Sequence, residues 1–471
     1  MCMIGVWFRH DLRLTDNTAL LEAMNQNEQI IGIFHVNPKQ FKIGTKNHES
    51  FFKACRHFFE VSKEVGFPIH LLYGEIEAEF KQLIELFPEL TSIYFNQSER
   101  GFGKRRDEAM CQLFAAQGIK AYHYQDSHLH GANEIKKADG CAFKMFTPYY
   151  NVWIKQKKPL FRQIDSQKLA EKSVDETSKV FFEERNNQFN DLIADFSDVS
   201  EEEYGAKPVR QRCQYFIDHH LAEYATKRDF PAVDGTSKLS RFLRTGELSI
   251  RELYYRVVQD GQDSQGKETF IKELCWRDFY NMIYAENPDQ QTVEIQEKYR
   301  GMQWNQNKQL FEAWKKGETG FPIVDAAMRQ LNQTGWMHNR LRMIVASFLT
   351  KDLLLDWRLG ERYFSEQLVD YDPASNIGGW QWAASTGTDA VPYFRIFNPT
   401  TQGKKFDTQG AFVREYVPEL RKVESKFIHE PAKMTRQLQE NSGCIIGKDY
   451  PAPIVDHKEM RQLALDLFGK Q

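Results

Sequence analysis

The sequence of 471 residues has little cysteine and no long apolar run, and both shortages exclude classes of protein. Its seven cysteines are scattered singly, without a C-x-x-C pair. This pattern argues against a disulfide scaffold or a thiolate zinc site and favours a reducing compartment. No apolar stretch approaches the roughly 20 residues that span a bilayer, and residues 1–17 lack a signal-peptide core. We therefore predict a cytoplasmic protein with no membrane segment.

An excess of basic charge is also lacking, since 62 Lys and Arg face 65 Asp and Glu, for a formal charge of −3. The balance argues against a basic surface overall, but a nucleic-acid reader needs only a local basic rim. Four residues are candidates for such a rim: Arg228, Arg340, Lys404 and Lys405. Aromatic residues, in contrast, make up 13% of the chain, and seven of the nine Trp fall between Trp276 and Trp382.

Residues 1–130 alternate short apolar runs with helical patterns. The apolar runs predict buried strands at 4–8, 30–36, 69–73, 92–95 and 119–124. The patterns between them predict helices at 18–24, 51–65, 75–87 and 104–117. This alternation is typical of an α/β domain with a doubly wound parallel sheet. The chain then turns polar from about residue 155, and we interpret residues 131–206 as a solvated interdomain connection.

Beyond residue 207 the strand patterns disappear. Helical periodicity covers 211–226, 238–243, 249–260, 267–285, 309–316, 323–333, 339–357 and 362–370. We therefore predict an all-α domain over residues 207–471, and for the whole chain an α/β plus all-α fold. The α/β half has neither a G-x-G-x-x-G after its first strand nor a P-loop, which argues against a standard dinucleotide or nucleotide site there.

Two segments of the helical half carry groups that suit a ligand. Residues 235–240 place three hydroxyls and a Lys at a predicted helix start, which is either a pyrophosphate site or an ordinary N-cap. Glu273, Trp276, Arg277 and Tyr280 share one helix face by their spacing. That face can stack on a flat heterocycle and hydrogen-bond its edge, or it is a helix with its Trp packed inward and its charges outward.

Two later segments have similar chemistry. Asn339 shares a face with Arg342 or Met343, and Arg beside an amide suits a phosphate or a heterocycle edge. We interpret the neighbouring His338 as structural and predict no metal site. Residues 370–382 form a polar loop whose glycines let the backbone approach a planar ligand. The residues alone thus predict a Trp-rich polar pocket for a planar, phosphate-bearing molecule.

Taken in this order, these segments resemble the photolyase/cryptochrome family. The resemblance begins at the N-terminal signature 7–17 and continues through 146–148, 228–240, 273–280 and the dense block 319–406. Within the family it is similar to the class I cyclobutane pyrimidine dimer photolyases of bacteria. It implies an N-terminal antenna-type domain, a helical domain that binds FAD, and light-dependent DNA repair by a monomer. In that reaction, photoexcited FADH⁻ passes an electron to a dimer flipped out of single- or double-stranded DNA.

The resemblance also assigns residues. Those matching FAD contacts are Tyr224, Thr236, Ser237, Lys238, Leu239, Ser240, Phe270, Asn339, Arg342, Asp370, Tyr371, Asp372 and Asn376. Those matching catalytic positions are Glu273, Trp276, Met343 and Asn376, with Trp304, Trp357 and Trp380 as an electron-transfer triad. Those matching DNA contacts are Arg228, Glu273, Trp276, Arg277, Tyr280, Asn339, Arg340 and Gln402. We expect Glu273 to be protonated in an apolar pocket and to donate to the dimer, and Asn376 to face flavin N5.

The resemblance leaves the antenna chromophore and one functional alternative open. Folate-binding relatives carry an Asn-Glu pair where this chain has Phe102 and Gly103, so the methenyltetrahydrofolate antenna is not supported, whereas deazaflavin, another flavin or none remain open. The alternative function is a non-repairing blue-light photoreceptor with the same fold, and Glu273, Trp276 and Asn376 favour repair over it. The chain shows no evident hydride-acceptor site, which argues against a flavin oxidoreductase that acts on small substrates. Residues 336–339 differ from the His-rich segment expected of (6-4) photoproduct enzymes, which disfavours a (6-4) substrate.

Overall fold

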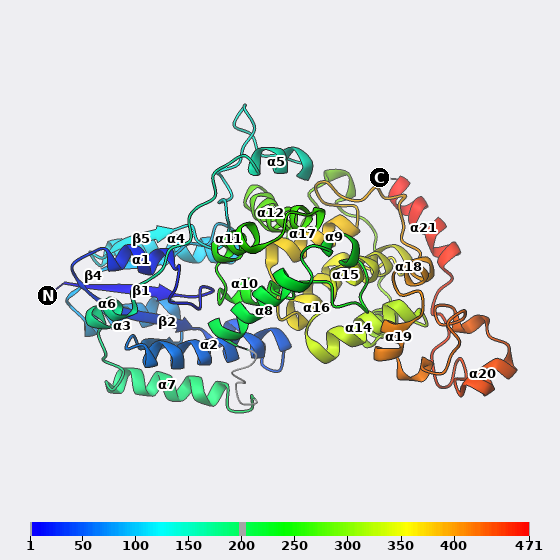
Figure 1. The fold of residues 1–471 in the computed structure, drawn as a ribbon, viewed down its shortest axis with the longest axis horizontal. Coiled ribbons are helices and arrows are strands. Elements are labelled where there is room, and N and C mark those ends of the chain that lie inside the picture. Colours follow the sequence, from blue (N-terminus) through cyan, green and yellow to red (C-terminus); the bar gives the residue numbers. More distant parts are fainter. Residues whose placement is uncertain (1, 197–203, 471) are drawn as a thin grey trace.

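The computed structural model describes residues 2–196 and 204–470. An α/β region forms one end of the molecule, and a larger helical region forms the other (Figure 1). The elements of the α/β region are β1 (Met3–Phe8), α1 (Thr18–Met24), β2 (Gln29–Val36), α2 (Lys46–Glu64), β3 (Ile69–Tyr73), α3 (Ile76–Leu86), β4 (Leu90–Asn96), α4 (Gly101–Ala116) and β5 (Lys120–Tyr124). Every strand lies within two residues of its predicted position. The apolar runs of β1 to β4 are buried on both faces, whereas the edge strand β5 is exposed or half-buried.

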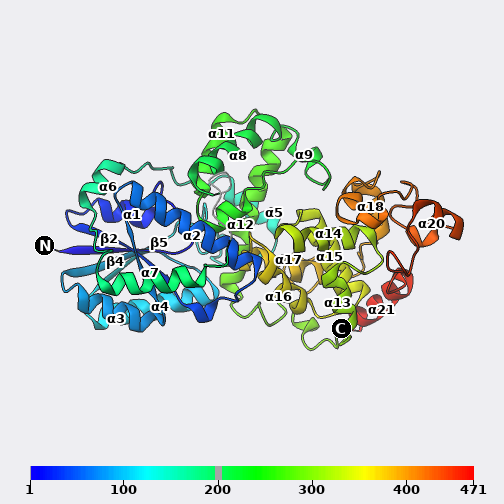
Figure 2. The ribbon, with the colours of Figure 1, turned by 90° about the horizontal axis from the view of Figure 1, so that it is seen from below.

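The five strands form one parallel sheet in the order β3-β2-β1-β4-β5, which confirms the doubly wound prediction. Helices cover both faces of the sheet (Figure 2). Alternate residues of β1 enter two separate cores: Ile4, Val6 and Phe8 face one, whereas Met3 and Trp7 face the other. The strand order reverses at β1, and such a switch point leaves a crevice at the carboxyl ends of the strands.

The polar stretch after residue 155 is folded, contrary to the prediction of a solvated connection. It follows α5 (Phe146–Trp153) and contributes α6 (Ser166–Lys172) and α7 (Val180–Leu192) to the α/β region. Leu169, Phe182 and Phe189 are buried in the two cores. Arg185 of α7 also donates to Glu79 at 2.9 Å. A few widely spaced apolar residues are enough to bury one stripe of each helix, so a mainly polar sequence does not exclude a folded segment.

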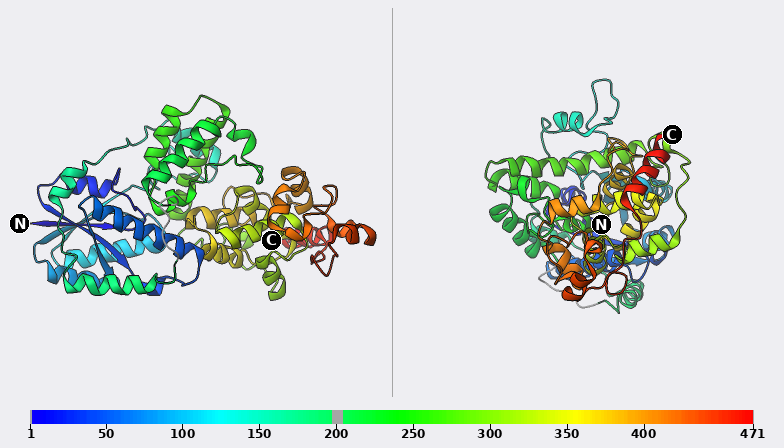
Figure 3. Two further views of the ribbon diagram at one scale, coloured as in Figure 1. Left: turned by 60° about the horizontal axis from the view of Figure 1, so that its bottom comes forward. Right: turned by 90° about the vertical axis from the view of Figure 1, so that its right-hand side faces the viewer.

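The helical region begins at residue 206 and surrounds a second pair of cores. Its α-helices are α8 (Ala206–His219), α9 (Tyr224–Lys227), α10 (Ser240–Thr245), α11 (Ile250–Asp260), α12 (Gln265–Glu286), α13 (Lys308–Lys316), α14 (Pro322–Thr334), α15 (Asn339–Ser347), α16 (Trp357–Gln367), α17 (Pro373–Ala383), α18 (Pro399–Phe406), α19 (Ala411–Tyr416), α20 (Arg436–Ser442) and α21 (His457–Gly469). Helices α18 to α21 lie at the end farthest from the sheet (Figure 3). Within residues 2–196 and 204–470, no helix has the length and apolarity needed to cross a membrane.

The predicted helices over 339–357 and 362–370 are wrong in their boundaries. Helix α15 passes into a π-helical turn, η3 (Phe348–Asp352), and the chain then turns at Leu354, where φ is +52°. Asp356 caps the next helix by accepting from the Arg358 backbone N–H. Trp357 is therefore the first residue of α16 and not the last residue of the preceding helix. The helical periodicity continues across the turn, so it does not reveal the break.

A buried charge network joins the two regions. Arg251 of α11 donates from Nε to Asp16 at 2.8 Å and from Nη2 to Asp126 at 2.7 Å. Burial disfavours the charged form of Asp126, but the guanidinium groups of Arg13 and Arg251 outweigh it and hold the pKa of this carboxyl well below its ordinary value. The network fixes the helical region against the carboxyl edge of the sheet.

Candidate functional site

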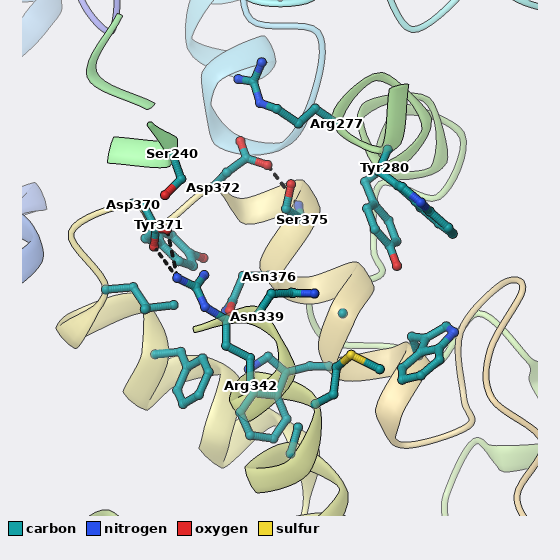
Figure 4. A pocket seen from close by; sticks show the side chains of 18 of the residues that line it. Ser240, Arg277, Tyr280, Asn339, Arg342, Asp370, Tyr371, Asp372, Ser375 and Asn376 are labelled. Atoms are coloured by element: carbon teal, nitrogen blue, oxygen red, sulfur yellow. Dashed lines mark hydrogen bonds and ion pairs between the residues drawn. The ribbon is translucent and has the colours of Figure 1, made fainter. Parts of the chain in front are cut away.

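A cavity of about 470 Å³ opens in the helical region between α12, α15, α16 and α17 (Figure 4). It brings together the three ligand-suited segments that the sequence places at 273–280, 339–343 and 370–382. The predicted residues that line it are Arg228, Ser240, Glu273, Trp276, Arg277, Tyr280, Asn339, Arg342, Met343, Asp370, Tyr371, Asp372, Asn376 and Trp380. The structure therefore supports a single pocket with an aromatic wall and charged groups.

The aromatic wall is held from behind. The Trp276 ring stacks on Phe146 of α5 with centroids 3.6 Å apart and planes 4° apart. Tyr280 lies one turn further along α12, and its ring centroid is 5.5 Å from that of Trp276. A Cβ on Gly378 would come within 2.3 Å of the Tyr280 ring, so only glycine lets α17 pack this closely against α12. The wall is therefore packed from behind by α5 and from the side by α17.

The surroundings of Glu273 differ from the predicted ones. Its carboxyl group forms an ion pair with Arg228, whereas the resemblance predicts a protonated acid in an apolar pocket. Burial lowers the pKa of Arg228, but the charge of Glu273 outweighs burial and keeps this pKa above its ordinary value. The Glu273 side chain is 30% exposed, which also departs from an apolar enclosure. The pair therefore offers a carboxylate and a guanidinium together at the cavity.

The segment after α16 is anchored by two acids. Asp370 accepts from Arg342 at 2.8 and 3.0 Å, and Asp372 caps α17 by accepting from the Ser375 N–H at 2.9 Å (Figure 4). Arg100, which comes from the α/β region, also pairs with Asp372 at 2.5 Å. Burial opposes ionisation of Asp372, but the guanidinium of Arg100 overcomes it and holds its pKa well below the ordinary value. The loop predicted at 370–382 is largely helix α17.

Asn376 is oriented by a carboxyl group that sequence reasoning missed. Its amide nitrogen lies 3.2 Å from Oε1 of Glu361, which also accepts from the Tyr371 hydroxyl at 2.9 Å. Burial raises the pKa of Glu361. With its nitrogen held by Glu361, the amide turns its oxygen in the opposite direction, which is an orientation assigned from hydrogen bonding. No motif marks Glu361, since its partners lie 10 and 15 residues further along the chain.

Other predicted residues lie outside the cavity lining. Of the segment 236–240, only Ser240 lines the cavity. The helix predicted from residue 238 begins at Ser240. Lys238 lies before it in the left-handed backbone region, with a φ of +53°, and its ammonium pairs with Asp234 at 3.1 Å. Tyr224 and Phe270 pack against each other with centroids 5.3 Å apart. These residues remain predicted cofactor contacts on the basis of the resemblance alone.

The predicted DNA contacts are spread over a wider rim. Arg340 pairs with Asp229 at 2.8 Å, and its guanidinium lies 4.6 Å from the Phe406 ring centre. Gln402, Lys404 and Lys405 all belong to α18, and the two lysines are exposed. Lys404 forms an ion pair with Glu430, so part of its charge is neutralised within the chain.

The three predicted electron-transfer tryptophans occupy different depths. Trp380 lines the cavity, Trp357 is fully buried, and Trp304 is 9% exposed beside Phe468 of the C-terminal helix, with centroids 6.0 Å apart. Trp314 is a further buried indole, 6.1 Å from Trp380. The relay through these three residues stays a prediction from the resemblance.

A second cavity of about 330 Å³ lies at the carboxyl edge of the sheet, where β1 and β4 end. It is rich in arginine, and the arginines that line it are Arg9, Arg100, Arg106, Arg244 and Arg277. Phe102 and Gly103 also line it. Arg277, Tyr371 and Asp372 line both cavities, so the two lie back to back. In the part of the chain that the structure describes, no three His, Cys, Asp or Glu side chains are grouped as a metal site.

Comparisons with known proteins agree with this architecture. Residues 4–168 match the family model described as DNA photolyase, and residues 270–470 match the FAD binding domain of DNA photolyase. The chain is 46% identical to the deoxyribodipyrimidine photo-lyase of Alkalihalophilus pseudofirmus, over 98% of this chain and 97% of the relative. This chain belongs to the photolyase/cryptochrome family.

Solved structures of two relatives resemble this one over nearly their whole length. A class III photolyase from Agrobacterium tumefaciens has a TM-score of 0.91 at 33% identity and covers all of this chain and 97% of its own. A cryptochrome from Synechocystis has a TM-score of 0.87 at 27% identity and covers 99% of each chain. The sheet followed by a helical domain, as the sequence predicts, is confirmed by both.

The FAD implied by the family fits the first cavity. A Cβ at Gly379 would meet no atom within 4 Å, so the backbone of α17 is open toward a bound ring. Arg277 donates to the Ser127 carbonyl at 3.5 Å, and no acidic group within ion-pair distance meets it among the described residues. Burial lowers the pKa of Arg277. A half-buried guanidinium without such a partner suits the diphosphate of a dinucleotide.

Proposed function

We propose that this protein is a deoxyribodipyrimidine photo-lyase that repairs cyclobutane pyrimidine dimers in DNA with light. The observation that carries the proposal is the cavity itself, which joins an oriented amide, Asn376, to the wall of Trp276 and the Glu273–Arg228 ion pair. When bound in its reduced form, FAD supplies the light-excited electron that opens the dimer and then recovers it.

The chain's own residues hold the dimer beside the cofactor. Trp276, supported by Phe146, stacks on the flipped-out dimer and contributes about 1–3 kcal/mol per base. The Arg228 guanidinium donates to a pyrimidine carbonyl, while Glu273 positions that guanidinium and accepts from a base N–H. Asn339 hydrogen-bonds the edge of the dimer, and Met343 packs against it.

A different set of residues holds the cofactor. Arg277 and the Ser240 hydroxyl bind the diphosphate, and Asn376 presents its amide oxygen to the flavin. Arg342, fixed by two hydrogen bonds to Asp370, lies against the same part of the cavity. Arg277 is predicted as a DNA contact, but its place between two cavities suits the cofactor better.

The protein binds single- or double-stranded DNA as a monomer in the cytoplasm. Arg340, Gln402, Lys404 and Lys405 face the phosphates around the cavity mouth, which positions the duplex without reading its sequence. Trp380, Trp357 and Trp304 relay electrons inward to keep the cofactor reduced. The arginine-rich second cavity takes an anionic antenna chromophore.

A non-repairing photoreceptor is the second candidate because a cryptochrome shares the fold. One experiment separates the two. Purified, FAD-loaded and chemically reduced protein is mixed with a DNA oligonucleotide that carries one thymine dimer, and dimer loss is followed in light and in darkness. Repair predicts loss in light only. A dimer that persists in light, with the cofactor still reduced, would refute repair and favour the photoreceptor.

A further inference from the structure

Trp357, the middle indole of the proposed relay, has a charged hydrogen-bond partner. Its Nε1 donates to Oε1 of Glu294 at 3.3 Å. Trp357 is fully buried, and Glu294 is 3% exposed. The same carboxylate oxygen accepts from Nη2 of Arg358 at 2.7 Å. Because a guanidinium keeps its charge in proteins, this pairing means that an ionised carboxylate touches the indole N–H.

The other nearby charges oppose an oxidised Trp357. The guanidinium carbon of Arg358 lies 4.9 Å from the centre of the indole ring. Trp357 is also the first residue of α16, where the helix dipole adds partial positive charge. Asp356 offsets part of this charge by pairing with Arg358 at 3.0 Å. Glu294 is the acid that contacts the ring itself, at the nitrogen that becomes more acidic when an electron is lost.

The position of Glu294 is fixed by the helix that carries Trp380. Gln381, fully buried in α17, donates to the carbonyls of Gln290 at 2.7 Å and Val293 at 3.0 Å. Its side-chain oxygen accepts from the Ile295 N–H at 3.0 Å. These bonds bracket Glu294 on both sides, so the carboxylate and the two inner indoles of the relay belong to one rigid unit.

Trp380 has a less polar environment. Its ring packs against Phe364 and Trp314, with centroids 5.1 and 6.1 Å away. Aromatic rings stabilise a positive charge less than a carboxylate in direct contact does, because their attraction is that of a quadrupole and not of a full charge. Contact with the Glu294 carboxylate therefore favours a positive charge on Trp357.

We propose that Glu294 is a positioning residue of the electron relay, whose carboxylate holds the Trp357 indole and stabilises the transient positive charge on it. The inference rests on the proposed relay. One electron leaves Trp380 for the photoexcited oxidised flavin, one from Trp357 refills Trp380, and one from Trp304 refills Trp357. A thiol in solution then gives one electron to Trp304 and becomes a thiyl radical, and its proton passes to water. The indole proton of Trp357 stays on Nε1 in the hydrogen bond to Glu294, so its N–H bond is kept and only an electron is transferred.

The test is Glu294→Gln, which keeps an oxygen acceptor of the same size but removes the charge. Asp356 remains to pair with Arg358. We expect photoreduction of oxidised, FAD-loaded protein by dithiothreitol to slow about tenfold, equivalent to about 1.4 kcal/mol. Transient absorption should show a shorter-lived tryptophan radical. Repair by chemically pre-reduced protein should be unchanged.

The hydrogen bond between Trp357 and Glu294 can also be tested by NMR, without light and without the cofactor. In protein with ¹⁵N-labelled tryptophan, the indole signal lost in Trp357→Phe identifies this residue, and Glu294→Gln should shift that signal most. The matched control is Glu297→Gln, since Glu297 is 84% exposed and pairs only with Arg300 among the described residues. Neither the rate nor the Trp357 signal should change in the control.

Failure of the inference and failure of the relay give different results. If Trp357→Phe and Trp304→Phe slow photoreduction but Glu294→Gln does not, the role of Glu294 is refuted and the relay stands. If both Trp→Phe variants photoreduce at the wild-type rate, the relay itself is refuted. A tenfold loss in Glu297→Gln would also overturn the inference, because an exposed carboxylate that does not hydrogen-bond the indole would then have the same effect.

Discussion

Trp276→Ala is expected to weaken binding of dimer-containing DNA far more than binding of undamaged DNA. The indole rests on Phe146 at a centroid distance of 3.6 Å, so it presents a preformed platform and loses little entropy when a base stacks on it. A base on such a platform contributes about 1–3 kcal/mol. At about 1.4 kcal/mol per tenfold change, removal of the ring should raise Kd about 5- to 150-fold.

The assay titrates protein in darkness against two labelled duplexes that differ only in one thymine dimer. Trp276→Phe serves as the matched control, since it keeps an aromatic face and should lose less affinity than the alanine variant. Thermal melting of both variants monitors the packing of Phe146 and Tyr280 around the site. Equal weakening on the two duplexes, or no weakening on the damaged one, would refute the stacking role.

Four further predictions concern the ion pairs and the relay. Arg251→Met leaves the buried Asp16 without its cation and Asp126 with Arg13 alone, and should lower the free energy of unfolding by about 3–5 kcal/mol, measured by urea denaturation. In the wild type, the folded-state pKa of Asp126 is depressed, so its contribution to stability is present above about pH 4 and is lost as the pH falls below that value, which melting at stepped pH values should reveal. Glu273→Ala removes the partner of Arg228 and should lower the repair yield about tenfold while photoreduction stays intact; equal losses in both assays would contradict its role. Trp304→Phe should slow photoreduction but spare repair by pre-reduced protein, and impaired repair would contradict a role confined to the relay.

The sheet and most helices could be predicted from the sequence because their signals are local. An apolar run such as 69–73 marks a strand buried on both faces, and the structure places β3 at those residues. Serine before a periodic stretch marks a helix start, as Ser249 and Ser264 do for α11 and α12. The break between α15 and α16 was missed because the apolar spacing continues across a turn at Leu354.

The residue types of the site could also be predicted, since motifs at 273–280 and 370–382 carry them within short segments. Their charge states depend on partners that the chain brings from far away. Glu273 was expected as a neutral acid, but Arg228, 45 residues earlier, makes it half of an ion pair. A motif identifies the side chain, whereas the charged and polar groups around that side chain in the fold determine whether it is ionised.

The sequence by itself determined an α/β domain followed by a helical domain, an aromatic and charged pocket, and the family of the chain. Only the tertiary structure decided which polar groups meet. Arg100 reaches Asp372 across 272 positions, and Glu294 reaches Trp357 across 63. Periodicity and capping depend on neighbours within a few residues, so they report local structure. The contacts that set charge and orientation form between segments that only the folded core brings together.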